Sequence, residues 1–324
     1  MVEILWRHEL VAVPVDVDPQ TLAVDAAQVE RLVTPHTRAI LIAHLFGSRM
    51  PLDDVARVAA RHKLMLLEDC AQALAADDFR GHPAADVSLF SFGPIKTRTA
   101  LGGALLRFRD AGLHWQAGIL QKSYPVQSRW QFLRRTATLS MLRLLTARLA
   151  FSAFVGACRV RGVDYDQFLQ RSVRGFGSGD LLSRIRRQAS APLLKLLERR
   201  LTSRDTPRII RRIVYTNRVL AGIPPSCRVG AAARDHTQWV LPIRSHASEE
   251  LVAALRQAGF DATRGASRLC AVSRDPEGAP PPLAAALLAQ IVYLPMWPEM
   301  SDQELQGMTD MIRSQIAGGL PLQE

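Results

Sequence analysis

The sequence has few cysteines, and their spacing matches neither a metal site nor a disulfide framework. Cys70, Cys158, Cys227 and Cys270 lie far apart, without a Cys-x-x-Cys or Cys/His pattern. The first sixteen residues also lack the long apolar core of a secretory signal peptide. We therefore expect no metal site and a reducing, cytoplasmic environment.

Acidic residues are scarce in the middle of the chain. The formal net charge of the 324 residues is +11, divided as −2 over residues 1–110, +16 over 111–218 and −3 over 219–324. This excess favours an anionic partner, such as a nucleotide-linked sugar, an anionic lipid or a nucleic acid. Aromatic residues are sparse there and no nucleic-acid-binding motif is present, so we expect no nucleic-acid partner. Ordinary solvated helix faces are the alternative.

The first part of the chain alternates strand-like and helix-like segments. Strand-like runs cover residues 11–17, 39–46 and 64–67, and helical patterns cover 25–33 and 51–62. This β-α-β-α-β order predicts an α/β domain with a mainly parallel sheet. Ligands of such sheets bind beyond the carboxyl ends of the strands, which is where Asp69 would lie.

Residues 129–200 are rich in Leu, Ala and Arg and predict helices, with a break at 173–180 where Ser178 or Asp180 is suited to cap the next helix. The most apolar window, 141–160, is interrupted by arginines, so we expect no membrane-spanning helix. A buried domain or dimer helix is the favoured interpretation, and an interfacial helix is the alternative. From residue 206 onward, strand-like runs at 239–243 and 291–294 and helices at 248–258 and 301–316 predict a small α+β domain.

Two short motifs carry the chemistry. The first is Glu68-Asp69-Cys70-Ala71-Gln72, and the second is the segment from Phe90 to Lys96, Phe-Ser-Phe-Gly-Pro-Ile-Lys, which Gly102 and Gly103 follow. Taken alone, Asp69 is a turn or cap residue and Lys96 a solvated charge. Together they suit pyridoxal phosphate (PLP), which needs a carboxylate for its ring nitrogen, a lysine for a Schiff base and donors for its phosphate.

These motifs resemble those of the DegT/DnrJ/StrS family of sugar aminotransferases. The resemblance implies a fold-type I PLP-dependent transferase, with a mainly parallel large domain over residues 1–205 and a small C-terminal α+β domain over 206–324. It implies that Lys96 forms the Schiff base and moves protons, that Asp69 pairs with the pyridine nitrogen, that Gln72 binds the ring's phenolic oxygen and that Ser91 binds the phosphate. His44, in a family-like His-x-x-Gly segment, either lines the substrate or cofactor pocket or is a structural histidine.

The implied activity is transfer of an amino group from an amino acid, with glutamate expected, to a keto group of a nucleotide-linked sugar or similar anionic small molecule. The resemblance also implies a homodimer, to which residues 129–200 would contribute. The family's N-terminal phosphate loop has no counterpart here, and its Asn-Tyr-Arg segment has only a loose one at 177–180, so we expect weak PLP binding. The alternative function is a catalytically impaired, aminotransferase-like binding or subunit-interaction protein. Peripheral membrane contact is a weaker third hypothesis.

Overall fold

The computed structural model describes residues 2–75, 77–145, 147–162, 180–202, 206–265, 269–274 and 278–318. The chain forms two compact units. The first unit comprises Met1–Phe90, Leu106–Arg109 and Asp205–Glu324, and the second comprises Ser91–Leu105 and Asp110–Arg204. The chain returns to the first unit at residue 205. The expected division into a cofactor-binding domain over residues 1–205 and a C-terminal domain over 206–324 stays a prediction.

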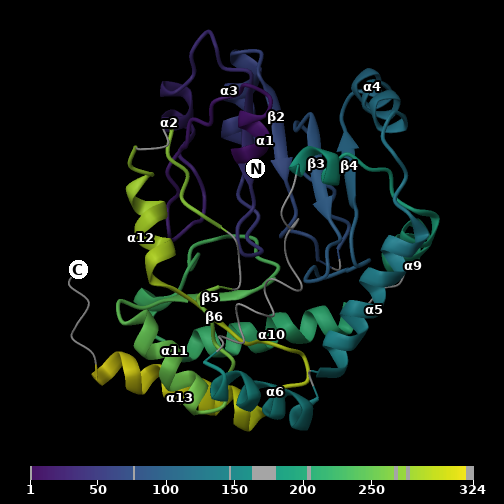
Figure 1. Ribbon diagram of the computed structural model, residues 1–324. Coiled ribbons are helices and arrows are strands. Elements are labelled where there is room, and N and C mark those ends of the chain that lie inside the picture. Colours follow the sequence, from purple (N-terminus) through teal and green to yellow (C-terminus); the bar gives the residue numbers. More distant parts are fainter. Residues whose placement is uncertain are drawn as a thin grey trace. The chain divides into compact units, whose positions relative to one another are not determined.

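A four-stranded sheet has the order β1 (Ala39–Ala43), β2 (Met65–Asp69), β3 (Val87–Ser91) and β4 (Ala104–Phe108) (Figure 1). β1 pairs with β2 and β2 with β3, both in parallel, and the register places Ala43 opposite Asp69 and Asp69 opposite Leu89. The predicted parallel sheet is therefore confirmed, and Asp69 is the last residue of β2, at the carboxyl edge.

Helices α1 (Val2–Trp6), α2 (Ala26–Arg31) and α3 (Asp53–Arg61) belong to the same unit. The apolar positions of α3 recur at helical spacing, so Val55, Val58 and Ala59 are all buried. They share a core with Ile42 of β1 and Leu66 of β2. The packing of α3 against this sheet face fixes the direction of β1 and β2 as they run toward the edge that carries Asp69.

The predicted strand at residues 11–17 is wrong, because this segment forms no strand in the structure. It carries Pro14, which has no backbone N–H for a sheet ladder, and its Asp16 serves another element. The two carboxylate oxygens of Asp16 accept hydrogen bonds from the backbone N–H groups of Leu283 and Ala284, each at 2.9 Å. These groups lie in the first turn of α12 (Pro282–Gln290), whose own N-cap residue provides no side-chain hydrogen bond.

The C-terminal part of the first unit pairs β5 (Leu241–Arg244) with β6 (Ile291–Leu294) in antiparallel orientation. Around them lie α10 (Thr206–Gly222), α11 (Ser248–Gln257) and α13 (Asp302–Gly318) (Figure 1). The short 3-10 helix η1 (Pro225–Cys227) contacts β5. One core of buried side chains joins these helices to both strands. The Ser301 hydroxyl accepts from the Glu304 N–H at 3.2 Å, and Glu304 Oε2 accepts from the Ser301 N–H at 2.7 Å, as expected for a capping box.

The second unit is helical over most of its length. It contains α4 (Ala111–Lys122), α5 (Arg129–Leu145), α6 (Arg148–Val160), α8 (Leu181–Ile185) and α9 (Ala191–Thr202), and α5 contacts both α6 and α9. Asp180 caps α8 by accepting from the Ser183 N–H at 3.0 Å, whereas Ser178 and residues 173–179 of the predicted break lie outside the described residues. In the described part of the chain no single helix is long and apolar enough to span a membrane, although the bent pair α5–α6 passes that criterion jointly.

The contact between Asp16 and α12 predicts a measurable contribution to stability. Asp16→Ala should lower the free energy of unfolding by about 1 to 2 kcal/mol, the usual cost of losing a helix cap. Asp16→Asn, which keeps one oxygen acceptor, should lose less. Urea unfolding followed by circular dichroism measures both variants, and a wild-type midpoint for Asp16→Ala would contradict the capping role.

Candidate active site

The predicted site residues fall into two groups, one in each unit. His44, Asp69 and Gln72 belong to the first unit, where they lie at or just after the carboxyl ends of β1 and β2. Ser91 ends β3 and Lys96 follows it in a turn, and both belong to the second unit. The structure therefore defines each group in detail, and their meeting in one site stays a prediction.

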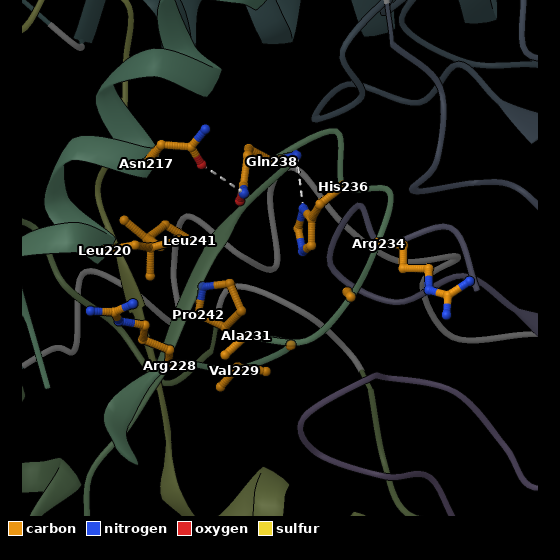
Figure 2. Close-up of a pocket in the computed structure, with 12 residues that line it drawn as sticks. Asn217, Leu220, Arg228, Val229, Ala231, Arg234, His236, Gln238, Leu241 and Pro242 are labelled. Carbon is orange, nitrogen blue, oxygen red and sulfur yellow. Dashed lines mark hydrogen bonds between the residues drawn. The ribbon is translucent and has the colours of Figure 1, made fainter. Parts of the chain in front are cut away.

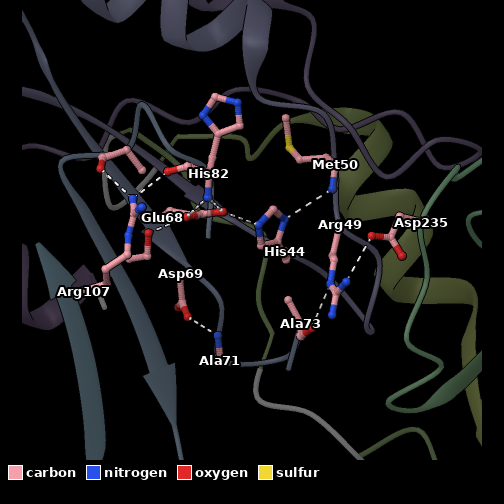
Figure 3. Close-up of polar contacts among 12 residues, drawn as sticks. His44, Arg49, Met50, Glu68, Asp69, Ala71, Ala73, His82, Arg107 and Asp235 are labelled. Atoms are coloured by element: carbon pink, nitrogen blue, oxygen red, sulfur yellow. Dashed lines mark hydrogen bonds and ion pairs between the residues drawn. The ribbon is translucent and has the colours of Figure 1, made fainter. Parts of the chain in front are cut away.

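Asp69 is half-buried and begins a tight turn. Its Oδ1 accepts a hydrogen bond from the Ala71 N–H at 2.9 Å, and its backbone carbonyl accepts from the His44 N–H at 3.1 Å. The first contact fixes the side chain and the second fixes the strand end (Figure 3). Asp69 therefore presents a pre-oriented carboxylate at the sheet edge, as a partner for a protonated ring nitrogen requires.

Gln72 lies in the same turn and reaches back to the loop after β1. Its Oε1 accepts from the Phe46 N–H at 2.7 Å, and an N–H donor requires the amide oxygen at this position. The Nε2 group of Gln72 therefore remains as a hydrogen-bond donor. This orientation suits the phenolic-oxygen contact that the sequence resemblance implies.

The loop that meets Gln72 is tightly constrained at Gly47. This residue has φ +102°, and a Cβ added there would lie 2.6 Å from the Trp239 backbone nitrogen and 2.7 Å from Thr237 Oγ1. Only glycine fits both the backbone conformation and the space. The His-x-x-Gly spacing thus has a structural reason, because the chain must turn closely past residues 237–239.

Glu68, next to Asp69, is the centre of a buried hydrogen-bond network, a role that its place in the motif does not reveal. Its carboxylate accepts from His44 Nε2 at 2.9 Å, from the Ser88 hydroxyl at 2.6 Å and from the His82 N–H at 2.9 Å (Figure 3). Glu68 is 2% exposed and His44 3%. Burial alone would raise the pKa of Glu68, but the hydrogen bonds from His44, Ser88 and His82 outweigh it and lower that pKa.

The contacts of His44 define its tautomer and favour the structural alternative. Its Nδ1 accepts from the Met50 N–H at 3.3 Å, so Nε2 carries the proton that is donated to Glu68. Both ring nitrogens therefore hold protein groups together, and His44 serves to position the strand ends. The neighbouring Gly81 is part of the same arrangement, since a Cβ there would lie 2.4 Å from Glu68 Oε2 and 2.3 Å from Ser88 Oγ.

His44, Glu68 and Cys70 place ligand-type atoms within 4.8 Å of one another, which raises the question of a metal site. Burial, followed by the nearby Glu68 charge, raises the pKa of the Cys70 thiol far above its ordinary value, so the sulfur stays protonated. The imidazole lone pair already accepts the Met50 N–H. His44 and Glu68 are thus already engaged in hydrogen bonds within the protein.

Arg49 holds the segment that follows the site turn. Its Nε donates to the Ala73 carbonyl at 3.0 Å, and its guanidinium binds both oxygens of Asp77 and one of Asp235, the last at 3.2 Å. The guanidinium also lies over the Phe79 ring, 4.1 Å from its centroid. Burial alone would raise the pKa of Asp77, but the Arg49 charge and hydrogen bonds lower it. These contacts attach the end of the Asp69–Gln72 turn to the loop after β1.

Lys96 lies in a loop whose two ends are held by Phe92. The Phe92 N–H donates to the Gly103 carbonyl at 3.0 Å, and the Phe92 carbonyl accepts from the N–H groups of Ala100 and Gly102 at 3.0 and 2.9 Å. The Lys96 N–H donates to the Gly93 carbonyl at 3.1 Å, which forms a turn at the lysine. The glycine pair of the motif thus closes the loop that presents Lys96.

A cavity of about 330 Å³ lies elsewhere in the first unit, and none of the predicted site residues lines it (Figure 2). Its wall includes Asn217, Arg228, His236 and Gln238. Burial lowers the pKa of His236 to about 4, and its Nδ1 accepts from the Gln238 N–H at 3.0 Å. His236 is therefore a neutral wall residue near pH 7, and this cavity provides none of the chemistry of the two motifs.

Comparison with known proteins links this geometry to a family. Residues 2–144 match the model of the DegT/DnrJ/EryC1/StrS aminotransferase family, which includes both motifs. Over these 143 residues the chain is similar to that family. The family resemblance predicted from the two motifs is thereby confirmed.

Among curated family relatives, the L-glutamine:2-deoxy-scyllo-inosose aminotransferase of Micromonospora echinospora is 43% identical over 109 residues, 33% of this chain and 26% of that protein. The GDP-perosamine synthase of Caulobacter vibrioides is 39% identical over 102 residues, 31% of this chain and 27% of that protein. The matches thus span about a quarter of the length of these relatives.

Solved structures show the fold. The aminotransferase TlmJ of Streptoalloteichus hindustanus has a TM-score of 0.66 at 21% identity, covering 98% of this chain and 76% of that one. PseC of Helicobacter pylori, an aminotransferase involved in the biosynthesis of pseudoaminic acid, has a TM-score of 0.64 at 16% identity, covering 98% and 76%. The predicted fold-type I architecture is confirmed.

The Glu68 network predicts the effect of acid on stability. The ordinary pKa of glutamate is about 4.3, and both Glu68 and Asp77 have lowered pKa values in the folded protein. These two carboxylates stabilise the folded protein at pH values above their pKa values in the unfolded chain. This stabilisation is lost as the pH falls through their pKa values in the folded protein, because the unfolded chain takes up protons first. The urea midpoint should therefore decrease as the pH is lowered below about 4.3.

Glu68→Gln tests the carboxylate at the centre of this hydrogen-bond network. The amide NH2 would face donors, so we expect the free energy of unfolding at pH 7 to fall by about 2 to 3 kcal/mol and the acid-dependent decrease to become shallower. Glu249→Gln, at an exposed carboxylate, is the matched control and should leave both quantities nearly unchanged. If Glu68→Gln and the control behaved alike, the network would not hold the strand ends.

Proposed function

We propose that this protein is a PLP-dependent aminotransferase that transfers an amino group from an amino acid to a keto group of a sugar. The observation that carries the proposal is the turn after β2, where Asp69 and the Nε2 donor of Gln72 are held at the carboxyl edge of a parallel sheet. The similarity of residues 2–144 to the aminotransferase family supports the same conclusion.

The donor set of this chain fits PLP. Asp69 offers a half-buried carboxylate for the ring nitrogen, Gln72 offers a donor for the phenolic oxygen, Ser91 offers a hydroxyl for the phosphate and Lys96 offers the primary amine. The solved structure of ntda from Bacillus subtilis has the related cofactor PMP bound. When bound, PLP supplies an electron sink for the carbon that loses or gains the amino group.

The residues of this chain have separate tasks. Asp69 would keep the ring nitrogen protonated, because an opposite charge in a partly desolvated place favours the charged form. Gln72 would orient the ring, and Lys96, once its Nζ is released, would carry a proton to and from the substrate carbon. Glu68 and His44 position Asp69 through the ends of β1 and β2 without contacting the reactants.

For the substrates, we propose an anionic, nucleotide-linked keto sugar as acceptor. The name of the perosamine synthase relative includes a nucleoside diphosphate, and the positive charge of residues 111–218 suits such a group. We keep glutamate as the proposed donor, with glutamine as the alternative because the inosose aminotransferase relatives carry it in their names. A homodimer and a cytoplasmic location remain part of the proposal, the first to be tested by light scattering.

The role of Lys96 can be tested by labelling, because the chain has only four lysines: Lys63, Lys96, Lys122 and Lys195. Borohydride reduction of the protein mixed with PLP, followed by peptide mass spectrometry, should place the label on Lys96. Lys96→Ala should abolish both labelling and amino transfer, whereas Lys63→Ala and Lys122→Ala should change neither. Label on another lysine that persists in Lys96→Ala would overturn the assignment, and labelling without turnover would favour the binding-protein alternative.

Asp69→Asn tests the carboxylate without disturbing the turn, because the amide oxygen can still accept the Ala71 N–H. Loss of a charge-assisted contact costs about 1.5 to 3 kcal/mol, which equals a roughly 10- to 150-fold weaker affinity for PLP. Titration of the cofactor absorbance measures this change. A thermal melt of the cofactor-free variant should match wild type, and equal PLP affinity of the two proteins would remove Asp69 from the site.

A further inference from the structure

Helix α5 has an exposed apolar stripe. Trp130, Leu133, Ala137, Met141 and Leu144 recur at intervals of three and four residues, so they lie along one face of the helix. All five are exposed, with Trp130 at 77% and Leu144 at 75%. A contiguous apolar surface of this kind marks an interaction site on a folded protein.

The stripe is not the face that packs inside the second unit. The opposite side of α5 carries Phe132, Leu139 and Leu142, which are partly buried, and α5 contacts α6 and α9. Helix α5 is therefore apolar on two faces, of which the fold uses one. The other needs a partner from outside the unit.

Helix α6 extends the exposed apolar surface. Its first and last turns carry Leu149 and Val160, each 89% exposed, and Ala153 and Ala157, also exposed, lie between them at helical spacing. The axes of the two helices differ by 95°. Helix α6 therefore adds exposed apolar side chains in a second direction.

The charge around this surface is of one sign. Residues 111–160 contain seven basic residues and no Asp or Glu. On the helical wheel of α5, Arg129 and Arg134 lie on the two sides of the stripe, and both are exposed. An apolar face with Trp and Leu, flanked by arginines, is the pattern of a helix that lies in the plane of a membrane interface.

Charge complementarity decides between a lipid surface and a second copy of the chain. An isologous contact through the stripe would bring this basic segment of one copy against the same basic segment of the other. The segment 111–160 offers no carboxylate to offset this repulsion. Anionic headgroups supply the missing negative charge, and the boundary with the acyl chains accommodates Trp130 and the leucines.

We propose that the α5–α6 surface binds the face of an anionic membrane, with the apolar stripe in the boundary between headgroups and acyl chains. The contact is peripheral, because α5 has 17 residues and contains four arginines. This inference does not depend on the aminotransferase activity. The predicted homodimer contact within residues 129–200 would then involve other elements, such as α9.

Vesicle sedimentation tests the proposal with the full chain. Binding to vesicles of 30% phosphatidylglycerol in phosphatidylcholine should exceed binding to pure phosphatidylcholine, and it should weaken as the Debye length shrinks from about 10 Å at 0.1 M salt to about 3 Å at 1 M. Equal binding to both vesicle types, or no binding at low salt, would overturn it. Trp130→Phe should diminish the blue shift of tryptophan fluorescence that accompanies binding.

Paired variants separate the two components of the contact. Leu133→Ser with Leu144→Ser should weaken binding at least about 100-fold, since each fully buried leucine contributes a factor of at least about ten. Arg129→Gln with Arg134→Gln should weaken it roughly 30-fold, because each cation near an anionic surface is worth close to a fivefold factor. Leu194→Ser with Ile210→Ser, at exposed positions of α9 and α10, is the matched control and should bind as wild type.

Circular dichroism melts should show that all three double variants remain folded. Light scattering tests whether the stripe binds a second copy of the chain and not a membrane. If wild type were dimeric and the leucine double variant monomeric, with neither protein bound to anionic vesicles, the stripe would be a self-association surface and the membrane proposal would be wrong.

Discussion

The buried carboxylate of Glu68 is the constraint on which the candidate site depends. An isolated charge at 2% exposure would be strongly unfavourable, and three donors from three other segments stabilise it: His44 after β1, Ser88 in β3 and the backbone of His82. Because these donors must converge on one carboxylate, the ends of β1 and β2 and the start of β3 are held in register. Asp69 is the next residue, so its position follows from that of Glu68.

Strand alternation explains why two adjacent carboxylates have different tasks. Successive side chains of a strand point to opposite faces of the sheet, so Glu68 and Asp69 leave β2 in opposite directions. One enters the protein and forms structural hydrogen bonds, while the other stays half-buried and begins the turn that leads to Gln72. Glu68 therefore fixes the position of the next residue, Asp69, which is the group expected to bind the cofactor. A substitution of Glu68 is expected to affect the site by displacing Asp69, because Glu68 itself does not contact the reactants.

The parts of the fold that depend on local pattern could be predicted from the sequence. Strands β1 and β2 and helix α3 follow from apolar periodicity, and so does the helix expected from residue 301 onward. The Glu68 network could not, because its partners are 14 to 24 residues away and polar side chains carry no periodic signal. The strand predicted for residues 11–17 was wrong for a related reason, because Asp16 caps a helix 267 residues later in the chain.

The helical middle shows the limit of pattern alone. Helix α5 is apolar on two faces. For residues 141–160, which include its end, the sequence left a buried domain or dimer helix and an interfacial helix as alternatives. Only the three-dimensional structure distinguishes the face that packs, with Phe132 and Leu139, from the face that remains exposed, with Trp130 and Leu144. The lack of acidic residues over 111–160 then acquires a physical meaning. This segment has no carboxylate to neutralise its positive charges, and these charges lie beside an exposed apolar face. Anionic lipid complements such a surface better than a second positively charged protein surface would.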